Sequence, residues 1–138
     1  MDLNQLSSTI IKAAINVHKE LGPGLLESVY QICMLTELQT MGKKVQAEIA
    51  VPIYYQNRVV LEEGFRIDLL VEDSIIVELK SVGQIQDIHK KQLLTYLRLA
   101  KKNLGLLINF NEVLLKDGIT RIVNSTVKGD DFFDGCQT

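Results

Sequence analysis

Residues 65–80 read FRIDLLVEDSIIVELK, and this stretch decides the fold. Two runs rich in Ile, Leu and Val flank a polar triplet at 72–74, which is the pattern of a β-hairpin with a three-residue loop. Such a loop places Val71 opposite Ile75, and each further pair lies one step along the two strands. The period of two therefore predicts both the hairpin and its register.

In this register Asp68 stands opposite Glu78. Directly opposed residues share one face of a sheet and lie about 5 Å apart at Cβ, so the two carboxylates are predicted to be neighbours. Lys80 follows two residues after Glu78 and projects to the same side. A slip by one residue would set apolar side chains against charged ones, which disfavours other registers. The opposite face is expected to be apolar and to carry Ile67, Leu69, Val71, Ile75, Val77 and Leu79.

Adjacent carboxylates on a sheet repel each other and need a positive partner. Lys80 and Arg66 are candidates, and so is a divalent cation, because Mg²⁺ prefers hard oxygen ligands. A metal ion there would polarise a phosphodiester and lower the pKa of bound water, and a neighbouring lysine could orient or deprotonate that water. The alternative is a solvated hairpin with a charge cluster. Leu70 and Ile76 argue against it, because apolar residues on both faces are typical of an inner strand pair.

The pattern outward from the hairpin predicts the order helix, helix, three strands, helix and one or two strands. Apolar residues recur at helical spacing in three segments, residues 4–21, 25–41 and 87–101. Alternation or short apolar runs predict strands at 45–55, 59–61, 65–71, 75–82, 104–110 and 119–123, with a bulge or bend at Gly64. This order is that of an α/β domain in which helices cover a mixed sheet. The second helix is apolar nearly all round and is expected to be mostly buried, whereas residues 124–138 are expected to form a flexible tail.

Length and composition are those of one soluble domain spanning residues 1–138. With 46% hydrophobic and 23% charged residues, the sequence is unlike collagen-like, disordered or disulfide-scaffold chains. No apolar run approaches the roughly 18 residues of a membrane span, so no membrane association is expected. Cys33 and Cys136 lack zinc-site spacing, and a reducing cytoplasm is the expected setting. The net charge of -2 excludes nucleic-acid binding by overall charge and leaves a local patch or a metal-centred site.

Three motifs occur in order and carry a resemblance to a known family. Asp68 is followed after nine residues by ELK at 78–80, in a hairpin that precedes a helix. This pattern resembles the PD-(D/E)XK nuclease superfamily, with Ile67 where the signature has proline. QLLTY at 92–96 is similar to the Q-x-x-x-Y motif of the exonuclease-like branch, and GLLESVY at 24–30 is similar to the signature of the small bacterial and archaeal GxxExxY proteins.

The resemblance covers roughly residues 10–124 and implies a restriction-endonuclease-like core, in which a helix, a three-stranded meander, a helix and a further strand follow in order. In that superfamily the Asp and the Glu bind the metal ion and the Lys assists the attacking water. Carried over by position, these roles fall on Asp68, Glu78 and Lys80. The cofactor implied is Mg²⁺ or Mn²⁺.

Supporting residues follow from the same resemblance. The backbone carbonyl of Leu79 would be a further metal ligand, and Glu27, an acid in the first core helix, would complete the site. Gln92 and Tyr96 would steady the site or the substrate phosphate. Glu27 also has a purely structural interpretation, because the helix dipole favours an acid in the first turn.

Basic residues on or beside the third helix form a cluster, Lys90, Lys91, Arg98, Lys101 and Lys102. A solvated face explains this cluster, and so does a track for phosphates in which Lys90 and Lys91 contact nucleic acid. The neighbouring His89 would contact phosphate or cap the helix.

Four other residues have interpretations of their own. Glu48 is expected at the surface or in support of the site. Tyr30 is expected in the core with its hydroxyl hydrogen-bonded, and Cys33 is expected to pack in the core. His18 is expected on the surface of the first helix.

The first hypothesis is a metal-dependent nuclease that hydrolyses phosphodiester bonds in DNA, with nucleic acid as its partner. The alternative is a nucleic-acid-binding or assembly module on the same fold without turnover, which the weak overall basicity and the lack of a separate recognition domain favour. Hydrolysis of a small phosphorylated substrate is a third hypothesis. Enzymes of this fold often pair to cut two strands, but nothing in the sequence establishes a homodimer.

Overall fold

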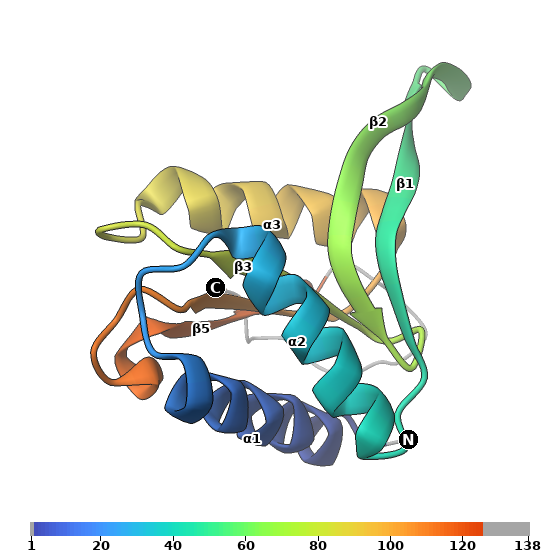
Figure 1. Cartoon of the computed structure of the whole chain (residues 1–138). Coiled ribbons are helices and arrows are strands. Elements are labelled where there is room, and N and C mark those ends of the chain that lie inside the picture. The colour runs from blue at the N-terminus through green and yellow to red at the C-terminus, as the bar shows by residue number, and fades with distance from the viewer. Residues whose placement is uncertain (1, 126–138) are drawn as a thin grey trace.

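The computed structural model describes residues 2–125, and its helices and strands follow in the predicted order (Figure 1). The elements are α1 (Leu3–Leu21), α2 (Glu27–Thr40), β1 (Val45–Tyr55), β2 (Arg58–Val71), β3 (Ile75–Lys80), α3 (Asp87–Ala100), β4 (Leu104–Asn109), the 3₁₀ helix η1 (Leu115–Gly118) and β5 (Ile119–Val123).

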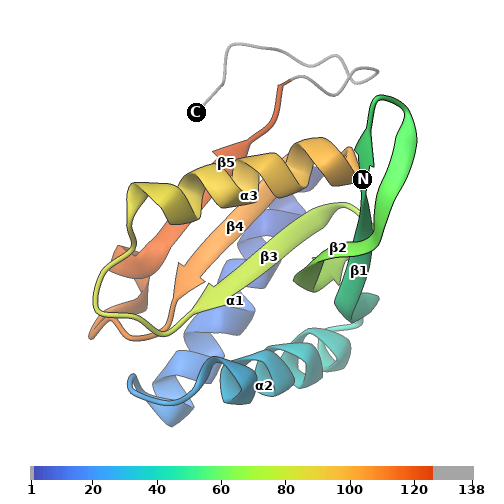
Figure 2. The ribbon, with the colours of Figure 1, turned by 90° about the horizontal axis from the view of Figure 1, so that it is seen from above.

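The five strands form one mixed sheet in the order β1-β2-β3-β4-β5. β3 and β4 are parallel and connected through α3, whereas the other neighbouring pairs are antiparallel. The hairpin register is the predicted one, with Val71 paired with Ile75 and Leu69 with Val77. α1 and α2 pack on one face of the sheet and α3 on the other (Figure 2). The predicted α/β architecture, helices covering a mixed sheet, is therefore confirmed.

Each face of the sheet buries its own apolar core. The core under α1 and α2 takes Val77 and Leu79 from β3. The core under α3 takes Ile76 from β3 together with Leu93 and Leu97 of the helix. β3 is thus an inner strand buried on both faces, and a charged side chain on it must find polar partners to remain there.

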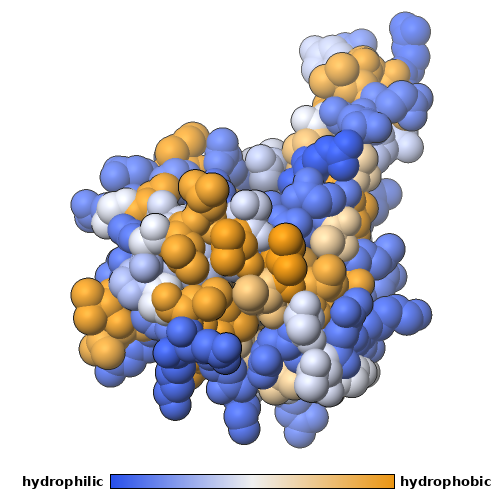
Figure 3. All heavy atoms as spheres, in the orientation of Figure 1, coloured by the Kyte–Doolittle hydropathy of each residue, from blue (hydrophilic) through white to orange (hydrophobic). Residues whose placement is uncertain are grey.

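α2 is less buried than its sequence predicted. Its buried side chains form a single stripe, Tyr30, Met34 and Leu38, whereas Ile32 is 64% exposed and Leu26, the residue before the helix, is 74% exposed. The prediction of a mostly buried helix is wrong because α2 packs against the rest of the molecule through this stripe alone and leaves its other faces to solvent. Figure 3 shows the apolar side chains that gather on the side of the molecule where α2 lies.

At Glu48 and Asp68 the β1–β2 ribbon twists, so that the residues before and after this point contribute to the cores on opposite faces of the sheet. Leu69 contributes to the core under α1 and α2, but Ile67, two residues away, contributes to the core under α3 together with Ile49. The prediction that Ile67 shares the face of Leu69 is therefore wrong. Glu48 has a left-handed backbone (φ 55°) at the position facing Asp68, and this local turn adds to the twist that strands ordinarily have.

The outer half of the β1–β2 ribbon forms an arm, residues 53–61, which extends beyond the helices (Figure 1). Its two-residue turn has left-handed backbone at both Gln56 and Asn57, which is the type I′ geometry suited to twisted hairpins. The two strands predicted at 59–61 and 65–71 are one continuous strand, and the predicted irregularity at Gly64 is confirmed. The register passes there from Val51–Phe65 to Ile53–Leu61, and a Cβ on Gly64 would overlap Ile53.

His18 is more buried than predicted for a surface residue of the first helix. It is 9% exposed, and its Nε2 lies 2.8 Å from the backbone oxygen of Glu112. Cys33 is partly buried against the core under α1 and α2, in keeping with the packing role expected for it.

The end of the described chain is also more ordered than expected. Asn124, predicted to begin a flexible tail, is 1% exposed, and its backbone N–H donates to the Asn103 carbonyl oxygen at 2.8 Å. The rest of that predicted tail, residues 126–138, lies outside the described residues. Between residues 2 and 125, no helix is both long enough and apolar enough to cross a membrane.

Candidate active site

The two predicted carboxylates meet where β2 separates from β3. The pairing of β2 with β3 runs from Val71 to Leu69. Beyond Leu69, hydrogen bonds from backbone N–H groups to side chains replace the backbone hydrogen bonds between the two strands. The Leu79 backbone N–H donates to Asp68 Oδ2 at 2.9 Å, and the Asp68 backbone N–H donates to Glu78 Oε2 at 3.3 Å. Because each acid accepts a backbone N–H from the facing strand, the two carboxylates are held side by side at the point where the strands part.

Burial raises the pKa of Glu78 to about 8, and the neighbouring Asp68 carboxylate adds to the increase. Burial likewise raises the pKa of Asp68, although the hydrogen bond from Leu79 and the charge of Lys80 oppose the change. Two acids with raised pKa values form a site that a cation would stabilise, because a cation favours the charged forms that burial and repulsion disfavour.

Lys80 lies beside the same site, at the end of β3. Together with Glu78 it lines a cavity of about 20 Å³, which is closed on the other side by α3. The remaining lining residues are His89, Gln92, Leu93, Tyr96 and Leu107. A cavity of this size holds about one water molecule. The structure therefore brings five of the predicted residues to one small polar cavity.

Arg66, the other cation considered as a partner for the carboxylates, is engaged elsewhere. Its guanidinium donates to Glu63 Oε1 at 2.9 Å and to the backbone oxygen of Glu48 at 3.1 Å. Within residues 2–125 Lys80 forms no ion pair, so its ammonium group is available to the site.

Glu27 reaches the site from the first turn of α2. Its carboxylate accepts the backbone N–H of Ser81, the residue after Lys80, at 3.2 Å. Its charge contributes to the raised pKa of Asp68, which shows that the two carboxylates lie within electrostatic range. Glu27 is exposed, so it borders the site from the solvent side.

Tyr30 holds the loop that precedes α2. Its hydroxyl donates to the Gly22 carbonyl oxygen at 2.6 Å and accepts the Leu25 backbone N–H at 3.1 Å. Its ring is fully buried and stacks on Phe110, with ring centroids 4.4 Å apart. The expected role of Tyr30 as a core aromatic with a bonded hydroxyl is confirmed.

α3 supplies one stripe of residues to the site. His89 Nδ1 accepts the Gln86 backbone N–H at 2.9 Å, which confirms its predicted capping role. Gln92 lies one turn further on and is exposed. The ring of Tyr96 stacks on Phe65 with centroids 4.1 Å apart, and burial, followed by the charges of Glu78 and Asp68, raises the pKa of Tyr96.

Lys90 and Lys91 do not line the cavity that holds Glu78 and Lys80. They line a separate hollow of about 330 Å³ between α3 and β5, with Leu94, Thr120, Arg121 and Ile122. At 100° per residue, positions 90, 91 and 94 lie on a different side of the helix from 89, 92 and 96.

Glu48, which was expected at the surface or in support of the site, raises the pKa of Asp68 through its charge. Two other residues near the site were not singled out from the sequence. Asn109, paired with Lys80 across β3 and β4, uses its side-chain amide to bind the backbone N–H and carbonyl of Val82 at 3.1 and 3.0 Å. A polar residue that ends a fully buried strand was the available signal for Asn109. Phe65, which supports Tyr96, had no such signal.

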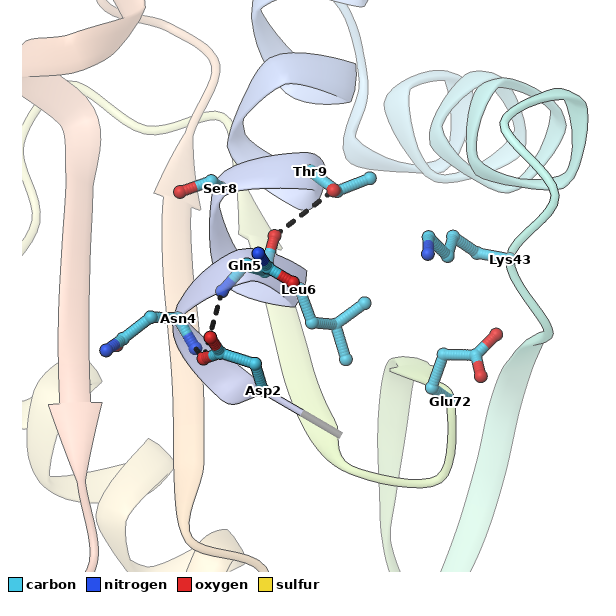
Figure 4. Close-up of a pocket in the computed structure, with 8 residues that line it drawn as sticks. All are labelled: Asp2, Asn4, Gln5, Leu6, Ser8, Thr9, Lys43 and Glu72. Carbon is cyan, nitrogen blue, oxygen red and sulfur yellow. Dashed lines mark hydrogen bonds between the residues drawn. The ribbon is translucent and has the colours of Figure 1, made fainter.

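A much larger hollow lies elsewhere, at the start of α1 (Figure 4). It measures about 520 Å³ and is lined by Asp2, Asn4, Gln5, Leu6, Ser8, Thr9, Lys43 and Glu72. Asp2 is occupied as the helix cap, since its carboxylate accepts the Asn4 backbone N–H at 2.9 Å. None of these residues lines the cavity beside Glu78, so size alone does not identify the functional site.

The donor set at the candidate site fits a hard divalent cation. Over residues 2–125, no three or more His, Cys, Asp and Glu residues are grouped closely enough to hold a metal ion. Mg²⁺, however, is ordinarily held by one or two carboxylates, with water and substrate oxygens as its other ligands. Glu78, which is buried, and Asp68, which is partly buried, both have raised pKa values and together meet that requirement.

Comparison with known proteins agrees with this geometry. The family model described as the PD-(D/E)XK nuclease superfamily matches residues 4–122. No curated protein and no solved structure matches the chain. The matched range contains nearly all of α1 and of β5 and every element between them, including each residue of the candidate site. The chain therefore belongs to the PD-(D/E)XK nuclease superfamily.

Proposed function

We propose that this protein is a metal-dependent nuclease that hydrolyses phosphodiester bonds in DNA, and that it belongs to the GxxExxY branch of the superfamily. The observation that carries the proposal is the convergence of Asp68 and Glu78 next to the cavity that Lys80 lines. We further propose that residues 1–138 act as one nuclease-like domain in the cytoplasm.

The metal ligands proposed are the carboxylates of Asp68 and Glu78, the backbone carbonyl of Leu79 and the carboxylate of Glu27. A bound Mg²⁺ or Mn²⁺ would lower the pKa of a coordinated water and polarise the phosphodiester. Glu27 already borders the site through its hydrogen bond to Ser81, so it needs no change of fold to take part.

Lys80 is proposed to orient the attacking water and to stabilise negative charge on the phosphate. Its backbone is fixed on both sides of the residue, because β3 pairs with β4 and Lys80 O accepts the Phe110 N–H at 2.8 Å. Gln92 and Tyr96 face the same cavity from α3 and would hold the phosphate or the water. A rigid backbone under Lys80 favours this role, since a catalytic ammonium must be held close to one position.

The nucleic acid is proposed to reach the site across the first turns of α3. His89 lines the catalytic cavity, whereas Lys90 and Lys91 line the hollow on the side of β5. A strand bound at the cavity would meet these two lysines as it leaves over the helix. Their contribution would be sequence-independent and would weaken with salt.

The test is cleavage of single-stranded, duplex and branched DNA with Mg²⁺ or Mn²⁺, compared among the native chain, Asp68→Asn, Lys80→Ala and the matched control Lys12→Ala. Lys12 is an exposed lysine of α1. We expect the control to cleave normally and each site variant to lose at least about a hundredfold in rate with its far-ultraviolet circular dichroism unchanged. Absence of cleavage by the native chain on all substrates would contradict the nuclease proposal.

A non-catalytic module is the second candidate, and one observation favours it. The hydrogen bonds to Asp68 and Glu78 already fill the gap between β2 and β3, so the acids have a structural use without metal. Calorimetric titration with Mn²⁺ separates the two candidates. The nuclease requires binding that Asp68→Asn removes, whereas a module of this kind needs no binding at these carboxylates.

A further inference from the structure

The hollow between α3 and β5 combines apolar surface with positive charge. The two elements are in contact (Figure 2), and the hollow between them measures about 330 Å³. Leu94 and Ile122 supply its apolar lining, and the exposed Lys90 and Lys91 line it beside them. The hollow is many times larger than the roughly 30 Å³ of one water molecule, so it has room for a large apolar side chain.

The positive charge at this hollow is open to a ligand. Within residues 2–125, Lys90, Lys91 and the exposed Arg98 form no ion pair. Arg98 follows Lys91 by seven residues and therefore lies on the same side of α3. Arg121 also lines the hollow, but its guanidinium is engaged on α1, where it donates to Asn4 Oδ1 at 2.9 Å.

The sequence beyond the described residues has the complementary chemistry. Residues 126–138 read TVKGDDFFDGCQT and contain three of the 17 acidic residues of the chain and one of its 15 basic residues. Residues 1–125 thus carry 14 of each and are neutral, so the net charge of -2 belongs to 126–138. Residues 130–134, DDFFD, set two adjacent phenylalanines between aspartates, and we call them the acidic aromatic segment.

The point at which the described chain stops places this segment within reach of the hollow. The Asn124 side-chain amide donates to the Lys102 carbonyl oxygen at 3.1 Å, just past the end of α3. Leu94 lies six residues before that end, about 9 Å back along the helix at 1.5 Å per residue. The six residues 126–131 span up to about 20 Å when extended, which is enough to bring Phe132 to the hollow.

We propose that the acidic aromatic segment docks in the hollow between α3 and β5 of the same chain. One phenylalanine fills the apolar part at Leu94 and Ile122, and the aspartates pair with Lys90 and Lys91. Burial of the aromatic ring provides most of the stabilisation, because exposed ion pairs contribute little. The charges fix where the segment binds and in which orientation.

Nucleic acid is the other candidate for this hollow, and the apolar lining favours the segment. A phosphate gains from Lys90 and Lys91 but not from Leu94 and Ile122, whereas a phenylalanine gains from the apolar pair. Where the two lysines also contact DNA, the segment and DNA exclude each other. That consequence rests on the proposed function, whereas the docking itself does not.

The first test uses tryptophan fluorescence of the full chain without DNA. The sequence contains no tryptophan, so Phe132→Trp and Phe133→Trp each introduce a single reporter. We expect at least one reporter to be protected from acrylamide quenching. Lys90→Glu combined with Lys91→Glu should lower the ratio of docked to free segment about tenfold or more, which increases the quenching.

A matched control makes the same charge change elsewhere. Lys12→Glu combined with Lys19→Glu alters two exposed positions on α1 and should leave the quenching unchanged. High salt should increase the quenching of the protected reporter, because it screens exposed charges. Quenching at both reporters equal to that of free tryptophan, or protection indifferent to Lys90 and Lys91, would overturn the docking.

The second test is cross-linking within one molecule. With Cys33 and Cys136 changed to Ser, Thr120→Cys in the hollow and Phe133→Cys should form a disulfide on mild oxidation. At about 1 µM protein the contact is intramolecular, because a short tether gives an effective concentration in the millimolar range. Ile32→Cys replaces Thr120→Cys in the control, since position 32 is exposed on α2 across the sheet. Equal cross-linking of both pairs would contradict the proposal.

DNA separates the docking from the proposed function. Changing Asp130, Asp131 and Asp134 together to Asn should strengthen DNA binding about threefold or more at low salt, because Lys90 and Lys91 become free. Docking without any DNA binding would contradict the proposed function and leave the docking supported. DNA binding by a chain in which neither reporter is protected would overturn the docking and assign the hollow to nucleic acid.

Discussion

Replacing Glu78 by Gln should remove a pH dependence of stability that the native protein carries. Glu78 is 8% exposed, and burial with the adjacent Asp68 raises its pKa from 4.5 to about 8. Between these two values the folded protein keeps a proton on Glu78 that the unfolded chain has released. The free energy of unfolding therefore falls as pH rises, and the stabilisation is fully lost once pH passes about 8.

The magnitude follows from the size of the shift. Each unit of pKa corresponds to about 1.4 kcal/mol, so the native protein should lose on the order of 5 kcal/mol relative to Glu78→Gln between pH 4.5 and 8. Glutamine has nearly the same shape and carries no charge at any pH. Groups that titrate equally in both proteins cancel in the comparison.

The assay is urea unfolding followed by circular dichroism at pH 5, 6, 7 and 8, with EDTA present to remove divalent cations. The difference between Glu78→Gln and the native protein should grow steadily over this range, while Glu20→Gln, an exposed control, should show a constant difference. Parallel stability curves for the native protein and Glu78→Gln would refute the claim that Glu78 is buried as an acid beside another acid.

Two further predictions concern the hydroxyl group of Tyr30 and the close contact between Gly64 and Ile53. Tyr30→Phe keeps the buried ring but leaves the Gly22 carbonyl and the Leu25 N–H without their partner, and we expect a loss of about 1–3 kcal/mol in unfolding free energy by denaturant titration. Gly64→Ala places a methyl group against Ile53 at the bulge of β2 and should cost about 1–3 kcal/mol, seen as a lower thermal midpoint. Unchanged stability of either variant would contradict the corresponding prediction, because it would mean that the loop or the bulge rearranges without cost.

The hairpin and the element order could be predicted because they rest on local periodicity. The loop at 72–74 fixed the pairing of Val71 with Ile75, and the pairing brought Asp68 beside Glu78. The change of side at Glu48 could not be predicted, because a left-handed backbone at a glutamate has no signature in the alternation of apolar and polar residues. Ile67 was placed in the wrong core for that reason.

The other errors have different causes. α2 was predicted to be mostly buried because apolar residues occur on nearly all of its faces. The sequence does not show how many of these faces pack against other elements, and in the structure only one does. Lys90 and Gln92 line different hollows. This could have been predicted, because successive residues of a helix are rotated by about 100° and these two positions therefore lie on different sides of α3. The binding of the Val82 backbone by Asn109 was missed although a polar residue at the end of an apolar strand was a signal for it, because the sequence does not show which segment lies beside that strand.

The loop before α2 joins two distant parts of the chain at one point. Gly24 has φ 96°, Glu27 binds the N–H of Ser81, and Tyr30 fastens Gly22. Gly24, Glu27 and Tyr30, each three residues apart, thus act at one connection between the helical layer and the strand that carries Lys80. A substitution at any of the three would loosen this connection and change how the two layers are aligned.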